Sequence, residues 1–161
     1  MTFRPLHILE VLDRHAVRSI LIGGLAGNAR GSTLVTGDVD ICYDRSDKNL
    51  EALAAALVEL NATLRGAPDG LPFVPDAKTL KAGDAFTFKT DAGALDCLGS
   101  PAGTKGYADL ASRADAIQID KLVVFVASLD DLIRMKQAAG RQRDLDAIHT
   151  LKALRDELEG R

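Results

Sequence analysis

The sequence predicts an α/β (α+β) fold, with a mixed β-sheet, helices flanking the sheet and a helical pair at the C-terminus. Segments with helical and with strand periodicity alternate along most of the chain, as they do in proteins whose helices pack on a sheet. The final segment has apolar residues at helical spacing, interrupted at Gly140. A chain of 161 residues has the length of one domain. We therefore expect residues 1–161 to form a single domain, with residues 128–161 as its C-terminal helical segment.

In the N-terminal half, apolar residues at intervals of three and four predict helices, and short β-rich or alternating runs predict strands. Pro5 suits the first turn of the first helix, and Ser46 or Asp47 would cap the third. Gly23 and the glycine after it stop the first strand. The expected elements are helices over residues 5–15, 25–30 and 47–60, and strands over residues 19–22 and 38–44.

The C-terminal half has the same two kinds of pattern after a weakly patterned segment. Residues 61–83 are rich in Gly, Pro and Asp and are predicted to be a loop with a short strand near Phe73. Ser128 is predicted to cap a helix that has two Asp residues in its first turn, where the helix dipole favours negative charge. The other expected elements are strands over residues 85–89, 93–98 and 122–127, a helical turn over residues 107–114, and a last helix over residues 142–159.

Composition and charge restrict the classes of function. Hydrophobic residues make up 47% and charged residues 27% of the chain, as in an ordinary globular protein. The formal net charge of -3 argues against a nucleic-acid binder that works through general charge, but it allows a local basic patch. The N-terminus lacks the apolar core of a signal peptide, and no apolar run approaches the ~18 residues that span a bilayer. We therefore expect a cytoplasmic protein with no membrane part.

Two acidic residues, Asp38 and Asp40, stand at the start of an apolar strand. Residues i and i+2 of a strand project from the same face, so the two carboxylates would lie side by side and repel each other. A divalent cation removes this repulsion, and Mg²⁺ prefers one or two carboxylates together with substrate phosphates. The alternative is a solvated acidic pair at a surface turn.

Asp96 is a third acidic residue, placed inside the apolar run 94–98. A charge in such a run costs free energy unless it is paired or binds a metal. If Asp96 shares the metal with Asp38 and Asp40, it is also suited to accept the proton of an attacking hydroxyl. The alternative is a position on the solvent face of an edge strand.

Candidate phosphate ligands flank these carboxylates in the sequence. Adjacent glycines at Gly23 and Gly24 let backbone N–H groups approach a phosphate, although they also mark ordinary turns. The Ser32 hydroxyl could reach a phosphate or make a turn hydrogen bond. Lys136 and Arg141 could neutralise a triphosphate, or they could form local ion pairs on a solvated pair of helices.

Together these residues resemble the nucleotidyltransferase superfamily, which includes polymerase β and kanamycin nucleotidyltransferase. The superfamily signature is a Gly-Gly turn after a strand, then Asp-x-Asp on the next strand, then a third carboxylate on a later strand. A closer resemblance is to minimal bacterial members, among them the AbiEii-type toxins. It rests on Gly23-Gly24-Leu25-Ala26, Gly31, Thr36, Asp38-Val39-Asp40, Lys136, Gly140-Arg141 and Asp144-Leu145.

The resemblance implies the nucleotidyltransferase fold and a metal-dependent enzyme that moves a nucleoside monophosphate from a nucleoside triphosphate to an acceptor hydroxyl. It implies tRNA as the acceptor and a cognate antitoxin protein as a partner, or an aminoglycoside-like small molecule as the acceptor. The implied roles are catalysis and binding of Mg²⁺ or Mn²⁺ by Asp38, Asp40 and Asp96, and triphosphate binding by Gly23, Gly24, Ser32, Lys136 and Arg141.

One position departs from the family pattern. Leu34 stands two residues before Thr36, where the family has an Arg. Arg30 and Arg45 are the candidates to replace that Arg. The departure motivates an alternative hypothesis, a non-catalytic nucleotidyltransferase-like module that binds a nucleotide or a partner protein.

Overall fold

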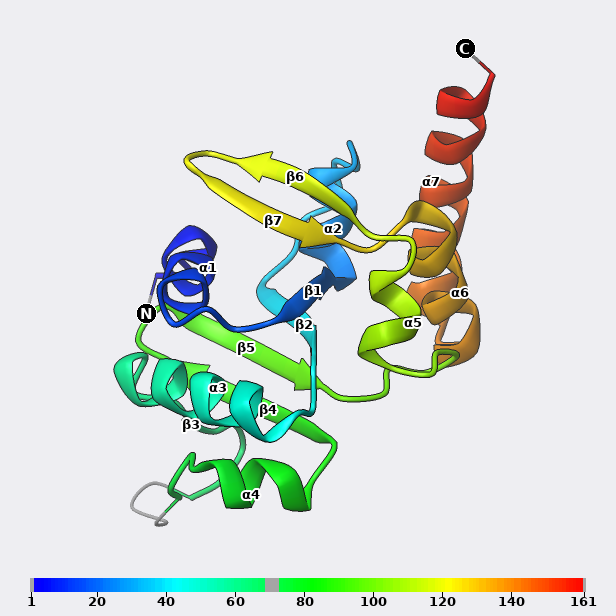
Figure 1. Cartoon of the computed structure of the whole chain (residues 1–161). Helices are drawn as coiled ribbons and strands as arrows, with labels where there is room; N and C mark the ends of the chain where they lie inside the picture. The colour runs from blue at the N-terminus through cyan, green and yellow to red at the C-terminus, as the bar shows by residue number, and fades with distance from the viewer. Residues whose placement is uncertain (1, 69–72, 161) are drawn as a thin grey trace.

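The computed structural model describes residues 2–68 and 73–160, which form a seven-stranded mixed sheet with helices packed on it (Figure 1). The predicted fold class is confirmed. The strands, in the spatial order β3-β4-β5-β2-β1-β7-β6, are β1 (Ser19–Ile22), β2 (Asp38–Tyr43), β3 (Thr63–Leu64), β4 (Ala85–Thr90), β5 (Gly93–Leu98), β6 (Asp115–Ile119) and β7 (Leu122–Val126). The helices are α1 (Pro5–Arg14), α2 (Gly23–Ala29), α3 (Asp47–Glu59), α4 (Ala77–Ala82), α5 (Tyr107–Ala111), α6 (Leu129–Ala139) and α7 (Gln142–Glu159).

The centre of the sheet is the pair formed by β2 and β5, which run parallel. Strand β1 lies on the other side of β2 and runs antiparallel to it, with Ile22 opposite Asp40. On the β5 side, Asp40 is opposite Asp96. Partners in register project from the same face of a sheet, so this register places two of the predicted acidic residues next to each other.

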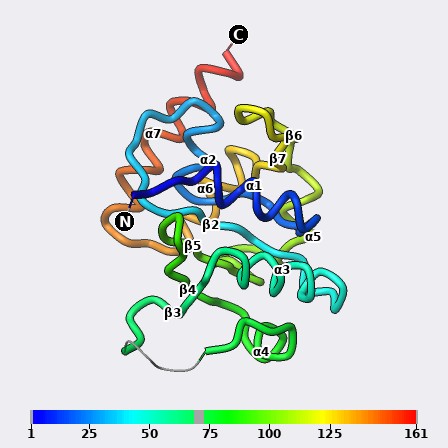
Figure 2. The backbone as a smooth tube through the Cα atoms, turned by 90° about the vertical axis from the view of Figure 1, so that its left-hand side faces the viewer, coloured from blue at the N-terminus to red at the C-terminus, as the bar shows by residue number. Residues whose placement is uncertain are grey.

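Helices cover both faces of these central strands. In Figure 2, α3 and α7 lie on opposite sides of β2 and β5. The core is almost wholly aliphatic and includes Ile41, Leu53 and Leu57, each no more than 1% exposed. Burying a side chain of this size contributes about 1.5–3 kcal/mol, so the acidic residues of β2 lie on a rigidly packed strand.

The helix boundaries follow the predicted capping residues. The Ser46 hydroxyl accepts a hydrogen bond from the backbone N–H of Asn49, and the Ser128 hydroxyl accepts one from Asp131. Gly140 ends α6 in the left-handed conformation, with φ of 67°. The chain therefore turns sharply between α6 and α7, which pack against each other beside the central strands (Figure 1).

Two parts of the structure differ from the sequence-based expectations. The segment 61–83 contains β3 and a helix, α4, which is capped by the Asp76 side chain; Phe73 is not in a strand. The ring of Phe73 instead packs 5.8 Å from that of Phe88, and residues 69–72 of the segment lie outside the described residues. Strand β6 was also not predicted; it forms a hairpin with β7 through Asp120, which has φ of 54°.

Within residues 2–68 and 73–160, no helix is both long and apolar enough to cross a membrane.

Candidate active site

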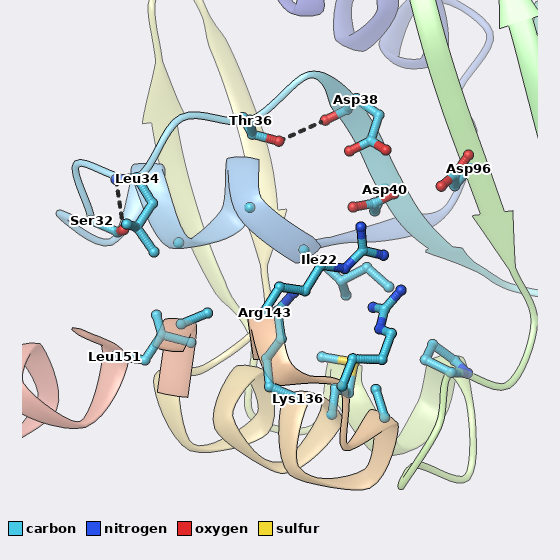
Figure 3. Close-up of a pocket in the computed structure, with 18 of the residues that line it drawn as sticks. Ile22, Ser32, Leu34, Thr36, Asp38, Asp40, Asp96, Lys136, Arg143 and Leu151 are labelled. Atoms are coloured by element: carbon cyan, nitrogen blue, oxygen red, sulfur yellow. Dashed lines mark hydrogen bonds between the residues drawn. The ribbon is translucent and has the colours of Figure 1, made fainter. Parts of the chain in front are cut away.

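A cleft of about 730 Å³ lies between the central strands, the loop 32–37 and the α6–α7 corner. Its sheet side carries carboxylates, and its helical side carries three cations together with Asp146. Figure 3 shows Asp38, Asp40 and Asp96 on the first side, with Lys136 and Arg143 facing them across the cleft. Every site residue predicted from the sequence lines this cleft: Gly23, Gly24, Ser32, Asp38, Asp40, Asp96, Lys136 and Arg141.

The three carboxylates form one cluster. One oxygen of each of Asp38, Asp40 and Asp96 lies within 4.8 Å of the corresponding oxygens of the other two. Strand β2 provides two of them at i and i+2, and the parallel register with β5 provides the third. The structure thus brings Asp96 to Asp38 and Asp40, from which the sequence separates it by more than fifty positions.

The charge on this cluster is incompletely balanced. Burial, and then repulsion from Asp38 and Asp96, raises the pKa of Asp40 to about 8, and Lys136 only partly opposes this rise. A set of three carboxylates that repel one another is the donor chemistry that a hard divalent cation satisfies. The residues present therefore fit Mg²⁺ or Mn²⁺.

Arg65 is a neighbour of the cluster that the sequence did not reveal. Its Nη2 atom donates to Asp96 Oδ1 at 2.7 Å. Arg65 directly follows β3, and the pairing of β3 with β4 and of β4 with β5 carries it to Asp96. No local motif marks this Arg, because the contact depends on the pairing of three strands.

The Gly-Gly turn has a steric role at the cluster. Gly23 has φ of +70°, and a Cβ on it would collide with the Asp40 carboxylate. A Cβ on Gly24 would lie 2.8 Å from Thr36 Oγ1. The two glycines thus make room for Asp40 and Thr36, and their predicted contact with phosphate stays a prediction.

The loop 32–37 is held by hydrogen bonds to its own backbone. The Ser32 hydroxyl accepts from the Leu34 N–H at 3.2 Å, which is the turn role that the sequence left open. The Asn28 side chain donates to the backbone oxygens of Ser32 and Leu34. This residue was not singled out from the sequence. Beside them the apolar side chains of Leu34 and Val35 line the cleft and are exposed.

The cationic side is organised around Asp144, which is fully buried. Lys136 Nζ lies 3.3 Å from Asp144 Oδ1, and Arg141 Nε lies 2.7 Å from Asp144 Oδ2. These contacts hold the pKa of Asp144 down at about 2, with the Arg141 hydrogen bond as the largest cause. Arg143 also lines the cleft and forms no ion pair with any residue in the described ranges.

Neither Arg30 nor Arg45 takes the place of the Arg that Leu34 replaces. The Arg30 guanidinium donates to the backbone oxygens of residues 126 and 127 and pairs with Asp115. Arg45 donates to the backbone oxygens of residues 81 and 83. Both side chains are thus occupied away from the cleft, and the cations that face the carboxylates across the cleft come from the α6–α7 corner instead.

No protein-family model and no curated protein matches the sequence. Solved structures do match it. A candidate nucleotidyltransferase from Thermotoga maritima superposes with a TM-score of 0.54 at 16% identity, covering 99% of this chain and 97% of that one. The antibiotic-resistance factor ANT(2'')-Ia superposes with a TM-score of 0.58 at 15% identity in its solution structure, covering 95% of this chain and 88% of that one.

This chain has the nucleotidyltransferase fold. A crystal structure of ANT(2'')-Ia in complex with adenylyl-2''-tobramycin gives the same TM-score of 0.58, at 17% identity, and covers 95% of this chain and 93% of that one. At identities this low, the structural similarity establishes the fold alone. The activity has to be inferred from the site. The closer resemblance to AbiEii-type toxins stays a prediction.

Proposed function

We propose that this protein is a metal-dependent nucleotidyltransferase that moves a nucleoside monophosphate from a nucleoside triphosphate to a hydroxyl acceptor, releasing pyrophosphate. One observation carries the proposal. Asp38, Asp40 and Asp96 converge on one point of a cleft whose opposite side holds Lys136 and Arg141. An acidic cluster facing cations suits a metal-bound polyphosphate, which needs positive charge on both sides.

Each residue has a role in this proposal. Asp38, Asp40 and Asp96 would hold Mg²⁺ or Mn²⁺, which when bound neutralises charge on the phosphoryl oxygens. Asp96 accepts the proton of the acceptor hydroxyl. Lys136 and Arg141 bind the triphosphate, and the backbone of Gly23 and its neighbours approaches the phosphates.

The proposal also names the chemical class of the acceptor. ANT(2'')-Ia, seen in complex with adenylyl-2''-tobramycin, supports a small polyhydroxylated molecule as the acceptor class. The formal net charge of -3 is in keeping with this choice, since RNA binding relies on positive charge. A tRNA acceptor, an antitoxin partner and a cytoplasmic location are the competing proposal, which rests on the toxin resemblance.

The test is incubation of the purified protein with each of the four α-labelled triphosphates and Mg²⁺. One set of reactions contains a panel of aminoglycosides and another contains total cellular RNA. The control is the Asp38→Ala/Asp40→Ala variant. Label transferred to an aminoglycoside by the wild type, but not by the variant, supports the small-molecule acceptor. Label transferred to tRNA would instead support the RNA acceptor.

A non-catalytic binding module is the competing function, and the apolar loop favours it. Leu34 and Val35 are 45% and 99% exposed, and Leu34 stands where the pattern of the resembled family has an Arg. In that case every labelled triphosphate stays intact in the presence of Mg²⁺. That result would overturn the enzyme proposal.

A further inference from the structure

A buried carboxylate that the proposed chemistry does not use lies behind the cationic side of the cleft. Asp144 is 0% exposed, whereas the side chains of its partners Lys136 and Arg141 are 28% and 53% exposed. Both partners also line the cleft. Each cation thus spans the distance between a buried anion and open space where a ligand can bind.

Four donors converge on Asp144. Lys136 Nζ and Arg141 Nη2 each lie 3.3 Å from its Oδ1 atom. The Nε atom and the backbone N–H of Arg141 donate to its Oδ2 atom at 2.7 Å and 3.1 Å. Both oxygens therefore accept hydrogen bonds from cationic or backbone donors. A buried carboxylate needs such partners, because burying an unpaired charge costs several kcal/mol.

The local backbone explains how one residue reaches both cations. Gly140 ends α6 with φ of 67°, so that Arg141 becomes the N-cap of α7. The side chain of Asp144, at the third position of α7, then reaches back and accepts a hydrogen bond from the Arg141 backbone N–H, as the acidic residue of a capping box does. Lys136, on the last turn of α6, meets the same carboxylate from the other side of the corner.

We propose that Asp144 is a positioning residue that holds Lys136 and Arg141 as a preformed binding pair for the polyphosphate of the substrate. This inference rests on the proposed function. Long cationic side chains lose rotamer freedom when they bind a ligand, and a buried anchor removes part of that cost in advance. Asp144 touches no substrate and acts only through the two cations.

The chain supplies a matched control in Asp131. It is also a buried carboxylate on the same helical pair, 3% exposed, and it is also held by two cations. Arg113 Nε lies 3.0 Å from Asp131 Oδ2, and Arg134 Nη2 lies 3.1 Å from Asp131 Oδ1. None of these three residues lines the cleft. Asp131→Asn therefore repeats the loss of a buried charge without disturbing the cleft.

The experiment measures binding of inorganic tripolyphosphate with Mg²⁺ by calorimetry, which needs neither the right base nor the right acceptor. We expect Asp144→Asn to weaken binding about tenfold or more, and Asp131→Asn to stay within about twofold of wild type. Lys136→Met should weaken binding in the wild type but add little to Asp144→Asn, because the pair has already lost its anchor. If Asp144→Asn does not fold, Asp144→Ser keeps an acceptor for the Arg141 N–H and replaces it in the test.

The outcomes separate this inference from the proposed function. Wild-type binding that Asp144→Asn leaves unchanged, or effects of Asp144→Asn and Lys136→Met that add in full, would overturn the positioning role. Absence of tripolyphosphate binding by the wild type would overturn it as well. Tripolyphosphate binding with the expected variant pattern, but without transfer of any labelled nucleotide, would refute the enzyme proposal and leave the role of Asp144 intact.

Discussion

Two carboxylates, Asp40 on the sheet side of the cleft and Asp144 buried behind its helical side, are in opposite electrostatic conditions. The pKa of Asp40 is raised to about 8, chiefly by burial and by the charges of Asp38 and Asp96. The pKa of Asp144 is lowered to about 2, chiefly by hydrogen bonding to Arg141. The first carboxylate lacks positive charge around it, and the second has enough from its own neighbours.

The difference shows where a cation is missing. Asp144 has its counter-ions built into the chain, so an added metal would find little to neutralise there. Among the described residues, the cations that act on the three carboxylates are Arg65, which contacts Asp96, and Lys136 and Arg141, which also neutralise Asp144. The fold therefore leaves unbalanced negative charge at one point, which is the property of a site that takes its cation from solution.

The largest expected effect comes from removing the negative charge of the sheet side. Asp40→Asn should reduce the proposed nucleotidyl transfer by about 10³-fold or more, because a proposed metal ligand is lost where charge develops in the reaction. Initial rates with saturating triphosphate and Mg²⁺ measure this effect, and circular dichroism checks that the variant is folded. A rate within tenfold of that of the wild type would show that Asp40 is not a ligand of the metal.

The same substitution should stabilise the metal-free protein at neutral and higher pH. Because the folded-state pKa of Asp40 lies above its unfolded value near 4, the folded state binds the extra proton and the Asp40 contribution to stability falls as pH rises from about 4 to about 8. Asp40→Asn abolishes this loss and should raise the free energy of unfolding at pH 8 by more than about 1 kcal/mol. Urea unfolding in EDTA across this pH range measures it.

Added Mg²⁺ and the helical side provide the controls for that pH profile. Mg²⁺ should stabilise the wild type at pH 8 and leave Asp40→Asn nearly unaffected, since the ion binds the ionised cluster. Asp144 has the opposite sign: its lowered pKa contributes stability above about pH 4 that is lost as pH falls towards 2. The difference in free energy of unfolding between the wild type and Asp40→Asn should change between pH 4 and 8. A constant difference would contradict the unbalanced charge at Asp40.

Gly23 gives a smaller effect that tests how tightly the sheet side is packed. Gly23→Ala places a Cβ against the Asp40 carboxylate and forces an L residue to φ of +70°, so we expect a loss of about 1–3 kcal/mol of stability. Gly37→Ala is the matched control, because a Cβ there would meet nothing within 4 Å. Thermal unfolding of both variants compares them, and equal melting temperatures would show that the Gly-Gly turn has room to spare.

The two sides of the cleft also differ in how far the sequence predicts them. Asp38 and Asp40 were singled out by their i and i+2 spacing on one strand face, Asp96 by a charge within an apolar strand, and the superfamily resemblance joined the three. The fold followed from periodicity and from caps such as Ser46 and Ser128, which the structure confirms. These signals are local, so they survive in a single sequence.

What the sequence did not predict depends on contacts between distant segments. Arg65 reaches Asp96 only through the pairing of β3, β4 and β5, and β3 has just two residues, too few for a periodic pattern. Lys136 and Arg141 were found, but the shared anchor at Asp144 needs the angle between α6 and α7. Strand β6 carries the weak pattern of an edge strand, exposed at three of its five positions.

The smallest expected effect concerns Arg65, which adjusts the charge on the sheet side without setting it. Arg65→Gln removes a cation whose Nη2 atom lies 2.7 Å from Asp96 Oδ1, so the cluster becomes more negative and should bind Mg²⁺ several times more tightly. The gain stays small because the Arg65 side chain is 38% exposed and solvent screens its charge. Mg²⁺ titration at low ionic strength measures the change, with Arg45→Gln, a substitution away from the cleft, as the control. Weaker Mg²⁺ binding by Arg65→Gln would instead show that Arg65 orients Asp96 for the metal, and that orientation there outweighs charge.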